Sequence, residues 1–131
     1  MSQENVQLVR AAMDAINTAD VDAVLEMAGP GFEYDVSRAV GPFSGVYSLD
    51  ELPRVWKEFF GAWESSRYEA DEFIETGDHV VTPFTNHLRG RDGIEVQARA
   101  AFVWSIRDGA IAHLCLYQER PEALEAVGLK E

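Results

Sequence analysis

The chain has 131 residues, of which 47% are hydrophobic and 11% aromatic, and this length and composition predict one packed domain over residues 1–131. Its 11 basic and 23 acidic residues give a net charge of −12, which would repel nucleic acid and anionic membranes and excludes them as expected partners. No apolar run approaches the roughly 20 residues of a membrane-spanning helix, and the polar N-terminus lacks the order of a signal peptide, so we expect a cytoplasmic protein.

The first third of the chain has helical periodicity. An apolar stripe at spacings of three and four residues predicts a first helix with one buried side, formed by Val6, Val9, Met13 and Ile16. Asp20 is placed to cap a second, short helix, and the Gly-Pro-Gly segment at 29–31 is expected to end it.

A strand and a long helix are predicted next. Apolar and acidic residues alternate over 32–36, which is typical of a strand, and a loop follows over 37–47. Pro53 is tolerated only in the first turn of a helix, so a third helix is expected to begin near Asp50. Its broad apolar face repeats at helical spacing and comprises Leu52, Val55, Trp56, Phe59, Phe60 and Trp63.

From Tyr68 onward the period changes to that of strands. Paired Gly and Asp residues at 77–78, 92–93 and 108–109 are turn signals, and they divide this part into strands near 67–76, 79–90, 94–107 and 110–119. Strands joined by tight turns are antiparallel. A twisted antiparallel sheet that curls around the helices gives an α+β fold with a cavity between the two layers.

Six short segments share an order and a spacing that are specific as a set: AINTAD at 15–20, GPFSG at 41–45, ETGDHVV at 75–81, VWSIRDGAI at 103–111, YQER at 117–120 and ALEAVGL at 123–129. With them the chain resembles SnoaL-like proteins of the nuclear transport factor 2-like superfamily over nearly its whole length. The resemblance implies a cone in which N-terminal helices pack on a curved, mainly antiparallel sheet. It also implies an internal pocket, frequent homodimers through the sheet, and no metal or organic cofactor.

Relatives of this kind include ketosteroid isomerases, polyketide cyclases, epoxide hydrolases and non-catalytic binders, so the fold does not select a reaction. Asp35 is the candidate general base, because it lies near the position of the proton-shuttling aspartate of the isomerases and apolar surroundings would raise its pKa. The strand alternation favours the alternative that Asp35 faces solvent. His113, within an apolar strand, is the second candidate acid–base group, with a structural role in the sheet as its alternative.

The partner groups of these reactions are incomplete in the sequence. The oxyanion tyrosine of the isomerases would fall at Ala12, and their second carboxylic acid near Ala100 or Phe102. Arg99 and Asp35 are possible members of an epoxide hydrolase relay, whose second aspartate is missing. The three histidines have no metal-binding spacing, so no metal site is expected.

Aromatic residues on the long helix and on the late strands are the candidate pocket lining. The candidates are Tyr34, Trp56, Phe59, Phe60, Trp63, Phe84, Phe102, Trp104 and Tyr117, of which two to four are expected to reach the pocket and the others to pack in the core. Val81, Ala101 and Val103 share the opposite parity, which predicts an exposed apolar patch and a homodimer through the sheet.

The sequence thus supports a protein that binds a small hydrophobic molecule in an apolar, aromatic-lined pocket. A cofactor-independent cyclase or isomerase that uses acid–base catalysis is one form of this function. The alternative is a non-catalytic, dimeric binding or interaction module, which the missing catalytic partners favour.

Overall fold

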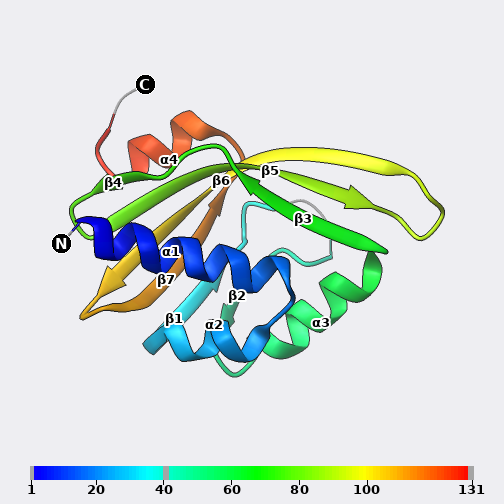
Figure 1. Ribbon diagram of the computed structural model, residues 1–131, viewed down its shortest axis with the longest axis horizontal. Coiled ribbons are helices and arrows are strands. Elements are labelled where there is room, and N and C mark those ends of the chain that lie inside the picture. Colours follow the sequence, from blue (N-terminus) through cyan, green and yellow to red (C-terminus); the bar gives the residue numbers. More distant parts are fainter. Residues whose placement is uncertain (1, 40–41, 130–131) are drawn as a thin grey trace.

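The computed structural model describes residues 2–39 and 42–129. Four helices and seven strands follow in chain order: α1 (Ser2–Asn17), α2 (Val21–Met27), β1 (Ala28–Asp35), β2 (Val46–Ser48), α3 (Leu52–Ala62), β3 (Ser65–Ala70), β4 (Ile74–Thr76), β5 (His79–Arg89), β6 (Glu95–Arg107), β7 (Ala110–Tyr117) and α4 (Arg120–Ala126). Helices α1, α2 and α3 lie on one side of a curved sheet, and α4 lies on the other (Figure 1). No helix in the described ranges is both long and apolar enough to cross a membrane.

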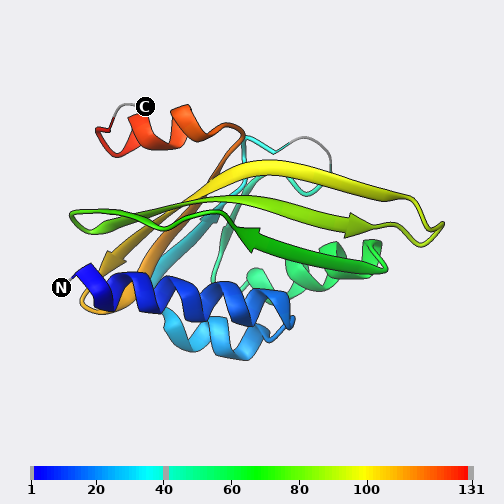
Figure 2. The same cartoon turned by 45° about the horizontal axis from the view of Figure 1, so that its top comes forward.

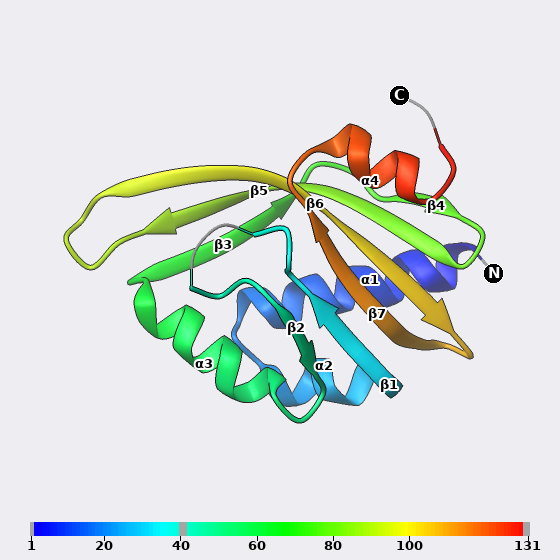
Figure 3. The same ribbon diagram turned by 180° about the vertical axis from the view of Figure 1, so that it is seen from behind.

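The sheet is mixed but mostly antiparallel. Its strand order is β2-β1-β7-β6-β5-β3, and β4 pairs with β5 beyond the end of β3. The first strand, β1, runs parallel to the last, β7, as the matching arrow directions show (Figure 3), whereas all other pairs are antiparallel. The predicted α+β class and the helix-covered, mainly antiparallel sheet are therefore confirmed.

The two faces of the sheet differ in what covers them. The inner face, which includes Phe102 and Trp104, packs with the N-terminal helices in the main core. On the outer face Val81 and Ala101 are fully buried, because Ala123 and Leu124 of α4 pack against them. The prediction of an exposed apolar patch at this place is wrong, since a helix of the same chain covers it.

The strand predicted over 67–76 is two strands in the structure. Ala70 pairs with Phe84 and Ile74 pairs with Val81, so residues 71–73 oppose only two residues of β5 and form a bulge. Pro83 lies at this place and has no N–H to offer, but its carbonyl accepts a hydrogen bond from the Asp71 N–H at 2.8 Å.

Two further boundaries differ from the sequence prediction. Strand β1 begins at Ala28, directly after α2, so that the Gly-Pro-Gly segment ends the helix and also starts the strand. Gly31 has φ +74° and lies where the β1–β7 register shifts, which explains how the segment serves both elements. Helix α3 ends at Ala62, so Trp63 has extended backbone and leaves the helical face to which its spacing assigned it.

Candidate functional site

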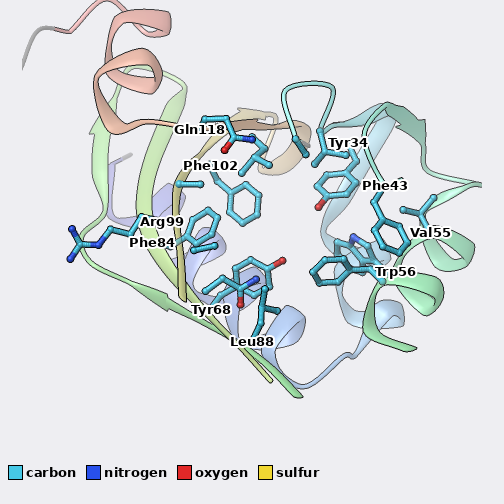
Figure 4. Close-up of a pocket in the computed structure, with 17 residues that line it drawn as sticks. Tyr34, Phe43, Val55, Trp56, Tyr68, Phe84, Leu88, Arg99, Phe102 and Gln118 are labelled. Carbon is cyan, nitrogen blue, oxygen red and sulfur yellow. The ribbon is translucent and has the colours of Figure 1, made fainter. Parts of the chain in front are cut away.

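A cavity of about 300 Å³ lies between the inner face of the sheet and α3. Its lining includes seven aromatic side chains: Tyr34, Phe43, Trp56, Phe59, Tyr68, Phe84 and Phe102. On the sheet side, the rings of Phe84 and Phe102 stack with centroids 4.6 Å apart, and Tyr68 packs against both at 5.2 and 5.9 Å. Inward-facing side chains of β3, β5 and β6 thus build one aromatic wall (Figure 4).

Helix α3 and the loop after β1 build the opposite wall. Trp56 meets the ring of Tyr34 edge-on, with centroids 5.8 Å apart. Phe59, one helical turn after Val55 on the same face, meets Phe43 of the loop edge-on at 5.5 Å. In Figure 4 Tyr34, Phe43 and Trp56 stand across the cavity from Phe84 and Phe102, so a flat molecule between the walls would contact aromatic rings on both sides.

Two tyrosine hydroxyls are the polar groups that point into this space. Figure 4 shows the hydroxyls of Tyr34 and Tyr68 on opposite sides of the cavity, each directed into it. Burial raises the pKa of Tyr34 to about 12. A hydrogen bond with the Trp56 side chain lowers this pKa and the charge of a nearby ionised Tyr47 would raise it, both by smaller amounts. Burial also raises the pKa of Tyr68. Both phenols therefore stay protonated at neutral pH and act as hydrogen-bond donors.

The remaining polar side chains of the lining are already engaged or turned away. The Asn86 side-chain oxygen accepts a hydrogen bond from the Ser66 hydroxyl at 3.3 Å, and the Gln118 amide donates to the Arg38 carbonyl at 2.7 Å. Arg99 contributes to the wall, but its guanidinium points away from the cavity (Figure 4). Among the described lining residues there is no Asp, Glu, His or Cys, so none supplies a base that titrates near pH 7.

Asp35, the candidate base, lies on the other face of the sheet. It follows the inward-facing Tyr34 and pairs with Cys115 of β7, and alternation along the strand turns its side chain outward. The Ser37 hydroxyl and N–H donate to the Asp35 carboxylate at 2.6 and 3.0 Å, and an Arg38 guanidinium nitrogen is 3.7 Å away. Partial burial alone raises the pKa of Asp35, but the Ser37 hydrogen bonds and the charges of Arg38 and His113 outweigh it and hold this pKa below its ordinary value.

His113 lies on the same outer face as Asp35. It pairs with Glu33 in the β1–β7 ladder, and its Nε2 is 3.8 Å from the Glu33 carboxylate. The structure thus brings the two catalytic candidates together, but on the side of the sheet that does not face the cavity. Neither residue lines the cavity, because strand parity turns both side chains to the other face of the sheet. The alternatives of a solvent-facing aspartate and a sheet-bound histidine fit these positions.

Of the nine predicted pocket aromatics, five line the cavity: Tyr34, Trp56, Phe59, Phe84 and Phe102. The other four predicted residues are not part of the lining. Phe60 turns toward Trp56 and Phe59 on the helix, and Trp63 lies past the helix end. Trp104 has the correct parity but is fully buried in the core, and Tyr117 lies opposite Ala101 on the outer face, under the guanidinium of Arg38.

Tyr68, the second donor, is not among the residues predicted from the sequence to line the pocket. The sequence does hold a signal, because charged Arg67 and Glu69 alternate with Tyr68 and Ala70. The structure has Tyr68 and Ala70 on the half-buried side of β3. Among the described residues no group of three or more His, Cys, Asp or Glu side chains is arranged to hold a metal ion.

Comparison with known proteins assigns the family. The family model described as "SnoaL-like domain" matches residues 9–114. The chain belongs to the SnoaL-like family of the nuclear transport factor 2-like superfamily. Members of this fold are often cyclases, isomerases or hydrolases that bind small molecules. No curated protein matches the sequence significantly.

Several solved structures share the fold of this SnoaL-like protein. An NTF2-like protein of unknown function from Burkholderia pseudomallei has a TM-score of 0.80 at 21% identity, over 98% of this chain and 99% of that one. TerC, co-crystallised with polyporic acid, has a TM-score of 0.78 at 18% identity, over 95% and 97%. An LEH-like epoxide hydrolase from M. tuberculosis has a TM-score of 0.73 at 19% identity, over 96% and 90%. At these identities the likeness shows the fold alone.

Proposed function

We propose that this SnoaL-like protein binds a small, uncharged, largely apolar molecule that carries a hydrogen-bond acceptor. The observation that carries the proposal is the aromatic cavity between the sheet and α3, with the neutral hydroxyls of Tyr34 and Tyr68 directed into it. Its volume of about 300 Å³ lies at the lower end of the usual range for ligand pockets, and fits a molecule of two or three fused rings.

The chemistry of the walls selects a flat and neutral molecule. Each favourable ring contact with a ligand adds about 0.5–1.5 kcal/mol beyond the burial of apolar area. A carboxylate or phosphate would lose its hydration without gaining a cation, because the Arg99 guanidinium points away and no other described lining residue is basic. A carbonyl oxygen, by contrast, accepts hydrogen bonds from phenols without carrying charge.

Binding alone is the function that the geometry supports best. A neutral phenol that donates to the carbonyl oxygen of a ligand would also stabilise negative charge that develops on this oxygen, which favours a cyclase or isomerase as the second candidate. Such a reaction needs a base, and the described lining offers none at neutral pH. A bound molecule that reacts without a base from the protein would be held by the same two tyrosines.

Calorimetric titration with three matched probes tests the proposal. The probes are fluorenone, fluorene, which lacks the carbonyl, and a fluorene carboxylate. We expect fluorenone to bind about fivefold more tightly than fluorene, as one net hydrogen bond of about 1 kcal/mol implies. We expect the double variant Tyr34→Phe, Tyr68→Phe to lose this preference, whereas Tyr117→Phe, on the outer face, leaves it unchanged. Preference for the carboxylate, or no saturable binding of any probe, would contradict the proposal.

A further inference from the structure

Each of the two tyrosine hydroxyls in the cavity has an N–H donor beside it. Trp56 packs edge-on against Tyr34, and its indole nitrogen is on the edge of the ring that faces Tyr34 (Figure 4). Burial raises the pKa of Tyr34, and a hydrogen bond between these two side chains lowers it by a smaller amount. An indole nitrogen only donates hydrogen bonds, so the Tyr34 oxygen is the acceptor.

Asn86 has the same relation to Tyr68. It lies opposite Tyr68 in the β3–β5 ladder, is 5% exposed and lines the cavity. Its side-chain oxygen accepts from the Ser66 hydroxyl at 3.3 Å, which leaves the amide N–H groups for another partner. Burial and the charge of an ionised Tyr34 raise the pKa of Tyr68, and a hydrogen bond with the Asn86 side chain lowers it. A hydrogen bond that lowers the pKa of a phenol is donated to its oxygen, so the Asn86 amide is the donor.

The backbones of both tyrosines are fixed as well. Tyr34 pairs with Tyr47 of β2 and with Leu114 of β7, so it has a strand on each side. Tyr68 is on β3, at the edge of the sheet, but the end of α1 lies beside it (Figure 2). There the Asn17 side chain donates to the Tyr68 carbonyl at 2.9 Å and accepts from the Tyr68 N–H at 2.7 Å, as a neighbouring strand would. The two hydroxyls therefore have little freedom to change their places in the cavity.

The donors beside the two oxygens decide where the phenol protons point. The O–H bond of a phenol lies near the plane of the ring, so the oxygen has one in-plane position for its proton and one for a donor. Trp56 and Asn86 fill the donor positions of Tyr34 and Tyr68, which leaves the protons to point into the cavity. A ligand group with a free lone pair meets a proton there. An N–H or O–H group also meets a proton, so it loses its hydration without making a hydrogen bond.

We propose that Trp56 and Asn86 determine the specificity of the cavity, because they hold Tyr34 and Tyr68 as donors and so exclude ligands whose polar group is itself a donor. This inference rests on the proposed function and narrows it. The polar group of the ligand is an acceptor without a proton, such as a ketone oxygen, an ether oxygen or a ring nitrogen. Trp56 then has two roles, since its ring belongs to the aromatic wall and its N–H orients Tyr34.

Titration with carbazole, alongside fluorenone and fluorene, tests the inference. Carbazole has the three-ring frame of fluorene with an N–H in the central ring, so it offers a donor where fluorenone offers an acceptor. We expect the native protein to bind fluorenone about fivefold more tightly than fluorene, and carbazole about tenfold more weakly than fluorene, because the carbazole N–H leaves water without finding an acceptor.

Trp56→Phe and Asn86→Leu each remove one N–H and keep a side chain that fills much of the same space. In either variant one tyrosine oxygen becomes free to accept, so the carbazole deficit relative to fluorene should shrink to about twofold, whereas the preference for fluorenone over fluorene is kept. The ratios between probes are the measured quantities, because a smaller wall at residue 56 weakens the binding of all three probes alike.

Thr85→Val is the matched control and should leave both ratios unchanged, because Thr85 is next to Asn86 but faces the other side of the sheet. Circular dichroism and urea unfolding establish that every variant is folded. Carbazole that binds the native protein as tightly as fluorene overturns the inference, as does a deficit that Trp56→Phe and Asn86→Leu both leave unchanged. In these two cases a native preference for fluorenone over fluorene leaves the proposed function standing, whereas the absence of that preference contradicts both.

Discussion

Truncating Phe102 tests whether the sheet side of the cavity is a packed wall. Its side chain is only 2% exposed, stacks on Phe84 at 4.6 Å and meets Trp104 edge-on at 5.6 Å. Phe102→Ala removes the central ring of this cluster and joins its space to the existing cavity. The neighbouring rings belong to three different strands, so they cannot close the gap without moving the sheet.

The expected cost follows from the volume removed. Truncation frees roughly 100 Å³, and at about 24 cal/mol per Å³ the enlarged cavity costs about 2 kcal/mol. The lost transfer of the ring from water brings typical Phe→Ala changes to about 3–5 kcal/mol. One side of Phe102 already borders empty space, so we expect the lower end, a decrease of about 3 kcal/mol in the free energy of unfolding.

Urea unfolding followed by circular dichroism measures this loss, which corresponds to a midpoint shift of about 1.5 M. Phe59→Ala is the matched control, because Phe59 lines the same cavity but is half-exposed on α3, and it is expected to cost about 1 kcal/mol. Equal losses for the two variants, or a loss below about 1 kcal/mol for Phe102→Ala, would refute the packing described for this wall.

Three further predictions concern titration and reactivity. The pKa of the Tyr34 phenol is raised from 10.0 to about 12, so the folded state keeps a proton that the unfolded state loses, and stability should fall between pH 10 and 12; Tyr34→Phe should make alkaline unfolding curves less steep in pH, with the part due to Tyr68 remaining. The pKa of Asp35 is lowered, so its contribution is present above its ordinary pKa and lost as the pH falls; Asp35→Asn should cost on the order of 1 kcal/mol at pH 7, with the difference from wild type vanishing in acid and fluorenone affinity unchanged. Cys115 is 4% exposed, and burial raises the pKa of its thiol. A thiol reagent should therefore label the native protein no faster than the rate at which local or global unfolding exposes this side chain, and rapid labelling of the folded protein would contradict the buried position.

The late strands were predictable because their turns have strong local signals. Gly93 and Gly109 adopt positive φ values of 89° and 76°, as the Asp-Gly pairs indicated, and the boundaries of β5, β6 and β7 follow within two residues. The bulge at 71–73 was not predictable, because it depends on where Pro83 of the neighbouring strand falls, and that register is a tertiary property.

The site was predictable only in its general character. The aromatic residues on α3 and on the late strands indicated an apolar pocket, and strand parity alone placed Phe84 and Phe102 on one face. Trp104 shares that parity, but position along the strand decides between core and cavity, and this needs the packing of α1. The hypothesis that Asp35 is catalytic rests on the family resemblance. The alternation along its own strand predicts an outward-facing side chain, and this is the orientation in the structure.

A crystal structure of the fluorenone complex tests most directly whether a neutral molecule sits between the two aromatic walls with its acceptor bound to a tyrosine hydroxyl. We expect the rings of fluorenone between Trp56 and the Phe84–Phe102 stack, with the carbonyl oxygen about 2.7 Å from the hydroxyl of Tyr34 or Tyr68. Fluorenone on the outer face of the sheet, or a cavity left empty by a saturating ligand, would contradict it.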